Sequence, residues 1–161
     1  MLITKAKREN TNEILDLYHS VVGSEFCVWD MEYPNLETIN FDIDNDGLYI
    51  GLIDNKIMCA ISICADLEFV GNLGWEFVDN VLEISRFVVS KEYQSQGFAK
   101  MMLEYVLNDL KRLKINSVHL ACQYQNIPAK KVYESFNFNV VSEIDMFNNH
   151  YLLMEKVMSD L

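Results

Sequence analysis

A polar turn between two apolar segments carries the residues best suited to hold an anionic ligand. The turn follows the predicted strand 81–89 and leads into a methionine-rich segment that starts at Phe98. Gly97 has no Cβ, so a ligand can approach its backbone closely. The first N–H groups of a helix lack helical partners and lie at the positive end of its dipole, which attracts phosphate. An ordinary strand-to-helix connection is the alternative interpretation. The turn and the start of the helix comprise Gln94, Ser95, Gln96, Gly97, Phe98, Ala99 and Lys100.

A second motif, at residues 126–138, favours the ligand-binding interpretation. The two motifs, in this order and at this separation, resemble the signatures of the GNAT superfamily of acetyl-coenzyme A-dependent N-acyltransferases. The matching positions are Gln94, Gly97 and Ala99 in the first signature, and Asn126, Ala129, Tyr133 and Phe138 in the second. Asn137 stands where the family usually has glycine. Because asparagine tolerates the left-handed backbone best after glycine, we expect Asn137 to adopt that conformation at the end of a helix.

The elements that must position these motifs can be predicted from the pattern of apolar residues. Asn10 and Glu13 form a candidate capping box for the first helix, and Asp54-Asn55 is a candidate hairpin turn. A longer loop is predicted over residues 66–80. The predicted strands are 2–6, 48–54, 56–65, 81–89, 117–122, 139–144 and 150–156, and the predicted helices are 10–22, one from Leu36, 97–113 and 128–136.

This order of elements is the one found in the family that the chain resembles. The resemblance implies an α+β fold in which a central mixed sheet of about six to seven strands is flanked by about four helices. Residues 1–161 then form a single acetyltransferase domain. Acetyl-coenzyme A is the implied co-substrate, and no metal is expected.

The resemblance also implies the chemistry of acyl transfer to an amine. An alkylamine with a pKa near 10.4 is protonated at neutral pH, so a base must remove a proton before the amine can attack the thioester. Glu83, on the central strand, is the candidate base, with Glu76 and Asp79 as substitutes; a salt bridge, for example to Arg86, is the other interpretation of Glu83. Tyr133 is the candidate acid that protonates the leaving thiolate, and a merely buried helix tyrosine is the alternative.

Other residues receive expected roles in binding. Backbone N–H groups of Phe87 and Val88 would stabilise the developing oxyanion, and Phe87 and Val89 would bond the pantetheine arm, as would Asn126. His119 is expected to be a strand residue and not a base, and Cys122 is not expected to be a nucleophile. The expected acceptor-binding residues are Trp29, Tyr33, Trp75 and Glu76, and lysines that can reach the nucleotide phosphate are Lys91, Lys100, Lys130 and Lys131.

The charge of the chain is segregated between its halves. Residues 1–80 carry 15 acidic and 4 basic residues, a net charge of −11, whereas residues 81–161 carry 9 of each. An acidic first half favours a cationic acceptor, although acidic surface also serves solubility. It argues against nucleic acid as a partner. The four cysteines have no metal-binding spacing, and no apolar run reaches membrane-spanning length, so we expect a cytoplasmic protein with no membrane partner.

Three alternatives to a small-amine acetyltransferase stay open at this level. The acceptor can be a protein N-terminus or a lysine side chain. The chain can also bind acetyl-coenzyme A as a catalytically silent sensor, or bind phosphate for an unrelated purpose, although it lacks the complete GxGxxG or GxxxxGK motif of such sites. The resemblance leaves the oligomeric state undecided and allows a homodimer.

Overall fold

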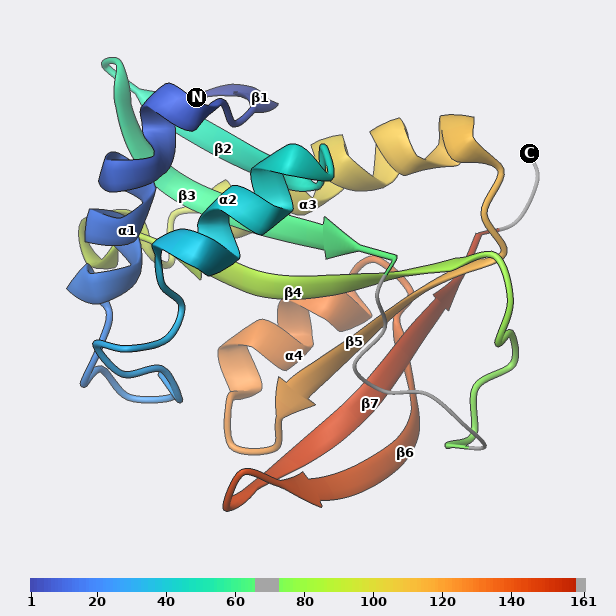
Figure 1. Ribbon diagram of the computed structural model, residues 1–161. Coiled ribbons are helices and arrows are strands. Elements are labelled where there is room, and N and C mark those ends of the chain that lie inside the picture. The colour runs from blue at the N-terminus through green and yellow to red at the C-terminus, as the bar shows by residue number, and fades with distance from the viewer. Residues whose placement is uncertain (66–72, 159–161) are drawn as a thin grey trace. The chain divides into compact units, whose positions relative to one another are not determined.

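The described part of the structure, a computed structural model covering residues 1–65 and 73–158, contains a seven-stranded mixed sheet and four α-helices (Figure 1). The strand order is β1-β2-β3-β4-β5-β7-β6, which confirms the expected α+β architecture. The strands are β1 Leu2–Lys5, β2 Leu48–Ile53, β3 Lys56–Cys64, β4 Val81–Val89, β5 Ser117–Gln123, β6 Asn139–Met146 and β7 Asn149–Val157. The helices are α1 Thr11–Ser20, α2 Leu36–Asp44, α3 Phe98–Leu110 and α4 Ile127–Glu134.

The chain divides into two compact units, each of which has its own packing. Unit 1 comprises Met1–Cys64 and Arg86–Val106, and unit 2 comprises Ala65–Ser85 and Leu107–Leu161. Of the predicted loop 66–80, residues 66–72 lie outside the described residues, and residues 73–80 contain neither helix nor strand, as predicted.

Unit 1 is built on the antiparallel strands β1, β2 and β3, against which α1 and α2 pack side by side (Figure 1). Asp54 and Asn55 both have positive φ, 51° and 62°, and join β2 to β3 in a two-residue turn. This confirms the predicted hairpin, because a turn of that length needs left-handed residues. The apolar core of unit 1 includes Ile14, Tyr18, Ile39, Leu48, Ile50, Ala60 and Val88.

The predicted capping box at the start of the first helix is wrong. Asn10 closes a short 3₁₀ helix, and its side-chain oxygen accepts a hydrogen bond from the Lys7 N–H at 2.8 Å. The carboxylate of Glu13 instead accepts from the N–H of Ile57 on β3, also at 2.8 Å. Tertiary contact with a neighbouring strand therefore outweighs the local capping pattern. The helix that was expected from Leu36 does begin there, and Asn35 caps it by accepting from the Thr38 N–H at 3.0 Å.

Unit 2 is built on β5, β7 and β6, which pair antiparallel in that order, and the start of β4 pairs parallel with β5. Helix α4 ends in a Schellman arrangement: the Phe138 N–H donates to the Tyr133 carbonyl at 3.2 Å and the Asn137 N–H to the Glu134 carbonyl at 3.0 Å. Asn137 has φ +64°, so the expected left-handed conformation is confirmed. In the described residues, no helix is both long and apolar enough to cross a bilayer.

Candidate active site

The polar turn of unit 1 is exposed and contains two residues in the left-handed conformation. Ser95 and Gly97 both have positive φ, 60° and 88°, and both are exposed. The side chain of Gln94 donates to the Val89 carbonyl at 2.9 Å and so ties the turn to the end of β4. The first helical bond of α3 runs from the Met101 N–H to the Gly97 carbonyl at 3.1 Å. The N–H groups of residues 98–100 therefore precede the helical ladder and can donate to a ligand.

Strand β4 has an irregular backbone at the residue just before those that were expected to bond the cofactor arm. Arg86 has φ +44°, although it is neither glycine nor asparagine and lies within a strand. A left-handed residue breaks the regular alternation of a strand and turns the next backbone groups in new directions. Phe87, Val88 and Val89 directly follow this irregularity. The Ser90 N–H then bonds the Met58 carbonyl of β3 at 2.8 Å.

Two predicted acceptor residues of unit 1 lie on the segment between α1 and α2. The Trp29 ring packs edge-on against buried Tyr18, with centroids 5.2 Å apart, and is partly buried. Tyr33 is 46% exposed, and its hydroxyl accepts a hydrogen bond from Arg86 at 3.0 Å. Sequence reasoning missed the ion pair between Arg86 and Asp42 on α2. The available signal was a single cation within an apolar strand.

In unit 2 the candidate acid Tyr133 lies on α4 and is 8% exposed. Its ring makes an edge contact with Phe138, with centroids 5.7 Å apart. Burial, and to a smaller extent Cys122, raises the pKa of the Tyr133 phenol above its ordinary value. The hydroxyl therefore stays protonated at neutral pH, which is the state that a general acid needs.

Asn126 of unit 2 has a structural role as the N-cap of α4. Its side-chain oxygen accepts from the Ala129 N–H at 3.2 Å, and Pro128 lies in the first turn of the helix. This bond fixes the side-chain amide immediately before the helix that carries Tyr133. The spacing of seven residues between Asn126 and Tyr133 thus corresponds to the cap and the last turn of one short helix.

The candidate base Glu83 is 3% exposed and lies directly opposite His119 in the parallel pairing of β4 with β5. His119 is also buried, and its Nε2 lies 3.1 Å from the carboxylate of Glu155 and 3.0 Å from the Ser117 hydroxyl. Burial lowers the pKa of His119, and this outweighs the opposite influence of Glu155. His119 is thus a neutral buried residue of strand β5 near neutral pH, which confirms only that it is a strand residue.

Trp75 and Glu76 are the remaining predicted residues of unit 2. Both contact the buried polar cluster of Ser117, His119 and Glu155. Trp75 stacks on the His119 ring, with centroids 3.9 Å apart and the planes 9° from parallel. Glu155 accepts from the N–H of Glu76 at 2.7 Å and from the N–H of Phe77 at 3.1 Å. One face of the Trp75 indole is therefore occupied within the protein, while the Glu76 side chain is exposed. Glu155 and its contacts with residues 76–77 were not found from the sequence.

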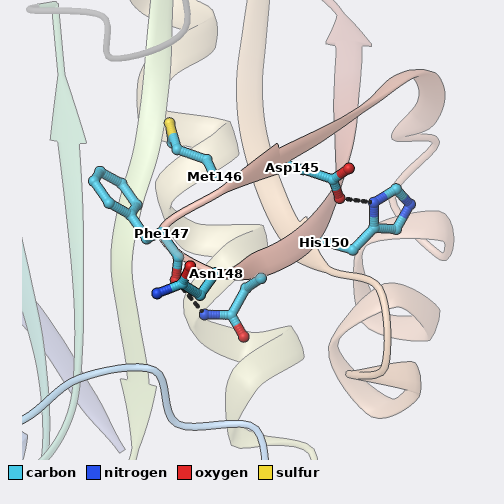
Figure 2. A pocket seen from close by; sticks show the side chains of 6 residues that line it. Asp145, Met146, Phe147, Asn148 and His150 are labelled. Carbon is cyan, nitrogen blue, oxygen red and sulfur yellow. Dashed lines mark hydrogen bonds and ion pairs between the residues drawn. The ribbon is translucent and has the colours of Figure 1, made fainter.

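An open hollow of about 600 Å³ lies at the tip of the β6–β7 hairpin, where it is lined by residues 145–150 (Figure 2). His150 is held there between the carboxylates of Asp145, at 2.6 Å, and Glu143, at 2.8 Å. Hydrogen bonds to Asp145 and then Glu143 raise the pKa of this exposed imidazole. None of the residues that the sequence pointed to lines this hollow.

The thiol of Cys122 is poorly suited to nucleophilic attack. Its burial raises the pKa to about 11, so the thiolate is scarce at neutral pH. Over residues 1–65 and 73–158, no group of three or more His, Cys, Asp or Glu side chains is arranged to hold a metal ion.

Comparison with known proteins places these features in a family context. The family model described as "Acetyltransferase (GNAT) family" matches residues 12–138. A probable spermine N(1)-acetyltransferase of Bacillus subtilis subsp. natto is 31% identical over 75 residues, which is 46% of this chain and 49% of that protein. The chain thus spans about half the length of the curated relatives it matches.

Solved structures share the fold over nearly the whole chain. An N-acetyltransferase from Staphylococcus aureus Mu50 superposes with a TM-score of 0.80 at 15% identity, covering 98% of each chain. The Salmonella typhimurium protein yncA, solved with its cofactor acetyl-CoA, has a TM-score of 0.80 at 13% identity and covers 100% of this chain and 95% of its own.

Proposed function

The chain belongs to the acetyltransferase (GNAT) family, and from that premise we propose that it moves the acetyl group of acetyl-coenzyme A to a primary amine of a small cationic molecule. The exposed turn at residues 94–97, with its two left-handed residues and the N–H groups that follow, is the observation that carries the proposal. It offers donors to a pyrophosphate at the positive end of α3.

The proposed chemistry is direct attack of the amine on the thioester. Glu83 accepts a proton of the ammonium group, directly or through water, because the amine must be neutral before it can attack the thioester. Backbone N–H groups of Phe87 and Val88 stabilise the oxyanion. Tyr133 then donates its proton to the sulfur of coenzyme A, so that the thiolate leaves as a thiol.

Two observations support a cationic acceptor. Residues 1–80, in which Trp29 and Tyr33 lie, carry the net charge of −11. The Bacillus subtilis relatives are named for spermine and spermidine as acceptors, although they match only about half of their length. A polyamine is therefore the first acceptor to test, and in that assignment Trp29 and Tyr33 of unit 1, and Trp75 and Glu76 of unit 2, are each candidate contacts of the amine.

The test is an assay of coenzyme A release against a panel of polyamines, monoamines, aminoglycosides and peptides with free N-termini or lysines. Saturable release with spermidine or spermine, and little with peptides, is the expected result. Preference for a peptide would make the chain a protein acetyltransferase. Acetyl-coenzyme A binding without release on any amine would make it a cofactor-binding sensor.

A further inference from the structure

A buried ion pair in unit 1 joins helix α2 to the irregular point of strand β4. The Arg86 guanidinium donates to both carboxylate oxygens of Asp42, from Nε at 2.9 Å and from an Nη at 2.7 Å. The side chains are only 13% and 2% exposed. The Ser62 hydroxyl of β3 donates to the same carboxylate at 2.6 Å. Asp42 thus accepts three hydrogen bonds and ties α2 to two strands.

Arg86 is held in its charged form. Burial alone would lower the pKa of Arg86, but the hydrogen bonds and charge of Asp42, together with Tyr33, raise it above its ordinary value. Removing two charges from water is costly, and an apolar pair of the same volume would often be as stable. A buried ion pair can instead serve to fix one conformation, because its hydrogen bonds are directional.

The ion pair with Asp42 can fix the backbone conformation of Arg86. A non-glycine residue at φ +44° is strained and persists only where the surrounding structure fixes it. The two-point contact with Asp42 fixes the direction of the Arg86 side chain, and therefore the backbone from which it extends. Phe87 and Val88, whose N–H groups are proposed to stabilise the oxyanion, are the next two residues of the chain.

The same guanidinium also holds the segment between α1 and α2. A third hydrogen bond runs from an Nη of Arg86 to the Tyr33 hydroxyl at 3.0 Å. Within that segment the Asp30 carboxylate accepts from the N–H groups of Glu32 at 2.8 Å and Tyr33 at 3.0 Å, and the Asp30 N–H donates to the Tyr33 carbonyl at 3.2 Å. Tyr33 is thus the point at which a locally closed turn is attached to β4.

We infer that Arg86 is a positioning residue for the acceptor: through Tyr33 it fixes residues 27–35, and through its own backbone it fixes the amides of Phe87 and Val88. The inference rests on the proposed function, in which this segment contacts the amine. Asp42 has a second effect in this arrangement. Its bidentate bond neutralises the charge of Arg86, so that a cationic acceptor is not repelled.

A double-mutant cycle tests the inference. Tyr33→Phe removes only the hydroxyl of a half-exposed side chain, and Arg86→Lys keeps the charge but loses the planar fork that reaches Asp42 and Tyr33 together. Tyr105→Phe is the matched control, because Tyr105 lies on α3 of the same unit and is 45% exposed, against 46% for Tyr33. The kinetic readouts are KM for spermidine, KM for acetyl-coenzyme A, and kcat.

Tyr33→Phe should raise KM for spermidine about 10-fold, the effect of one lost charge-assisted hydrogen bond, and leave KM for acetyl-coenzyme A unchanged. Arg86→Lys should also lower kcat, because it disturbs the amides after the bulge. The double variant should be no worse than Arg86→Lys alone. A Tyr33→Phe effect of the same size in the Arg86→Lys background would mean that the Tyr33 hydroxyl acts independently of Arg86, and would overturn the inference.

Hydrogen exchange of a peptide covering residues 27–35 provides a readout without any substrate. Tyr33→Phe and Arg86→Lys should each speed exchange in this peptide about 10-fold, whereas Tyr105→Phe should not. Unchanged exchange in both variants would refute the positioning role even if no acceptor is found. Conversely, faster exchange in a protein that releases no coenzyme A with any amine would leave the positioning role intact and reject the proposed function.

Discussion

At the scale of single residues, Gly97 has a backbone conformation that favours glycine and lies where the cofactor is proposed to bind. Its φ of +88° is strained for any β-branched residue, and a Cβ added there would project into open space, where the ligand is proposed to lie. We expect Gly97→Val to weaken acetyl-coenzyme A binding by at least about 10-fold, measured by calorimetry.

Gly23 provides the control for strain alone. It has φ +80°, and a Cβ there also meets nothing within 4 Å, but it follows α1 in the chain and is not part of the turn at residues 94–97. Gly23→Val should therefore cost similar stability and leave cofactor affinity unchanged. Equal affinity of Gly97→Val and the wild type would show that the turn does not hold the pyrophosphate.

Tyr133 is the second residue with a distinct prediction. Because burial raises its pKa, the phenol stays protonated throughout the neutral range, and its proton is available for the leaving thiolate. Tyr133→Phe should lower kcat by about 100-fold to 10,000-fold with little change in acetyl-coenzyme A affinity. Tyr151→Phe is the control for loss of a buried phenol, since Tyr151 is 9% exposed against 8% for Tyr133. An unaltered single-turnover rate in Tyr133→Phe would exclude the acid role.

At the scale of elements, the end of α4 depends on one left-handed residue. Asn137→Ala places a Cβ-bearing residue without a compensating polar group at φ +64° and should lower the free energy of unfolding by about 1 kcal/mol. Asn137→Gly should be neutral or slightly stabilising. Thermal unfolding of both variants beside Asn139→Ala, an exposed neighbour on β6, measures the effect. Equal stability of the alanine and glycine variants at 137 would contradict it.

The contact of β5 and β7 with residues 75–77 makes the stability of unit 2 sensitive to acid. The pKa of Glu155 is lowered: burial raises it, but the N–H groups of Glu76 and Phe77, the Ser117 hydroxyl and His119 together outweigh burial. The pKa of His119 is lowered by burial. In both cases the unfolded chain binds protons more readily, so the folded state loses stability as the pH falls, first below about 6.5 through His119 and then below about 4.3 through Glu155.

Denaturant unfolding between about pH 3 and pH 8 measures this dependence. Glu155→Gln should lose about 2 to 3 kcal/mol at pH 7, because an amide cannot accept all the bonds that the carboxylate does, and its stability should fall less steeply than that of the wild type below about pH 4.3. Glu134→Gln, a half-exposed position on α4, should follow the wild-type profile. A Glu155→Gln profile parallel to that of the wild type would mean that another group causes the acid sensitivity.

At the scale of the whole molecule, the segregated charge predicts how the choice of acceptor depends on salt. If residues 1–80 attract the amine, KM for spermidine should rise several-fold as ionic strength shortens the Debye length below about 8 to 10 Å. KM for a neutral amine of similar size should not change. A salt-independent KM for spermidine would assign the acidic half to ordinary solvated surface.

The sequence by itself determined the local conformation of the backbone. The turn at Gly97, the hairpin at Asp54-Asn55 and the left-handed Asn137 all depend on residues adjacent in the chain, and each was predictable because glycine, asparagine and aspartate tolerate φ above zero. The order of strands and helices followed from the same local patterns. Two signatures of a few residues each were then enough to indicate the family.

Only the tertiary structure decided the partners of the charged residues. Arg86 pairs with Asp42, 44 positions away, and Glu155 accepts from Glu76, 79 positions away. The capping box at Asn10 failed for the same reason, because Glu13 bonds β3 instead. A buried charge takes whichever partner the strand register and helix packing bring within 3 Å, and spacing along the chain does not encode that distance.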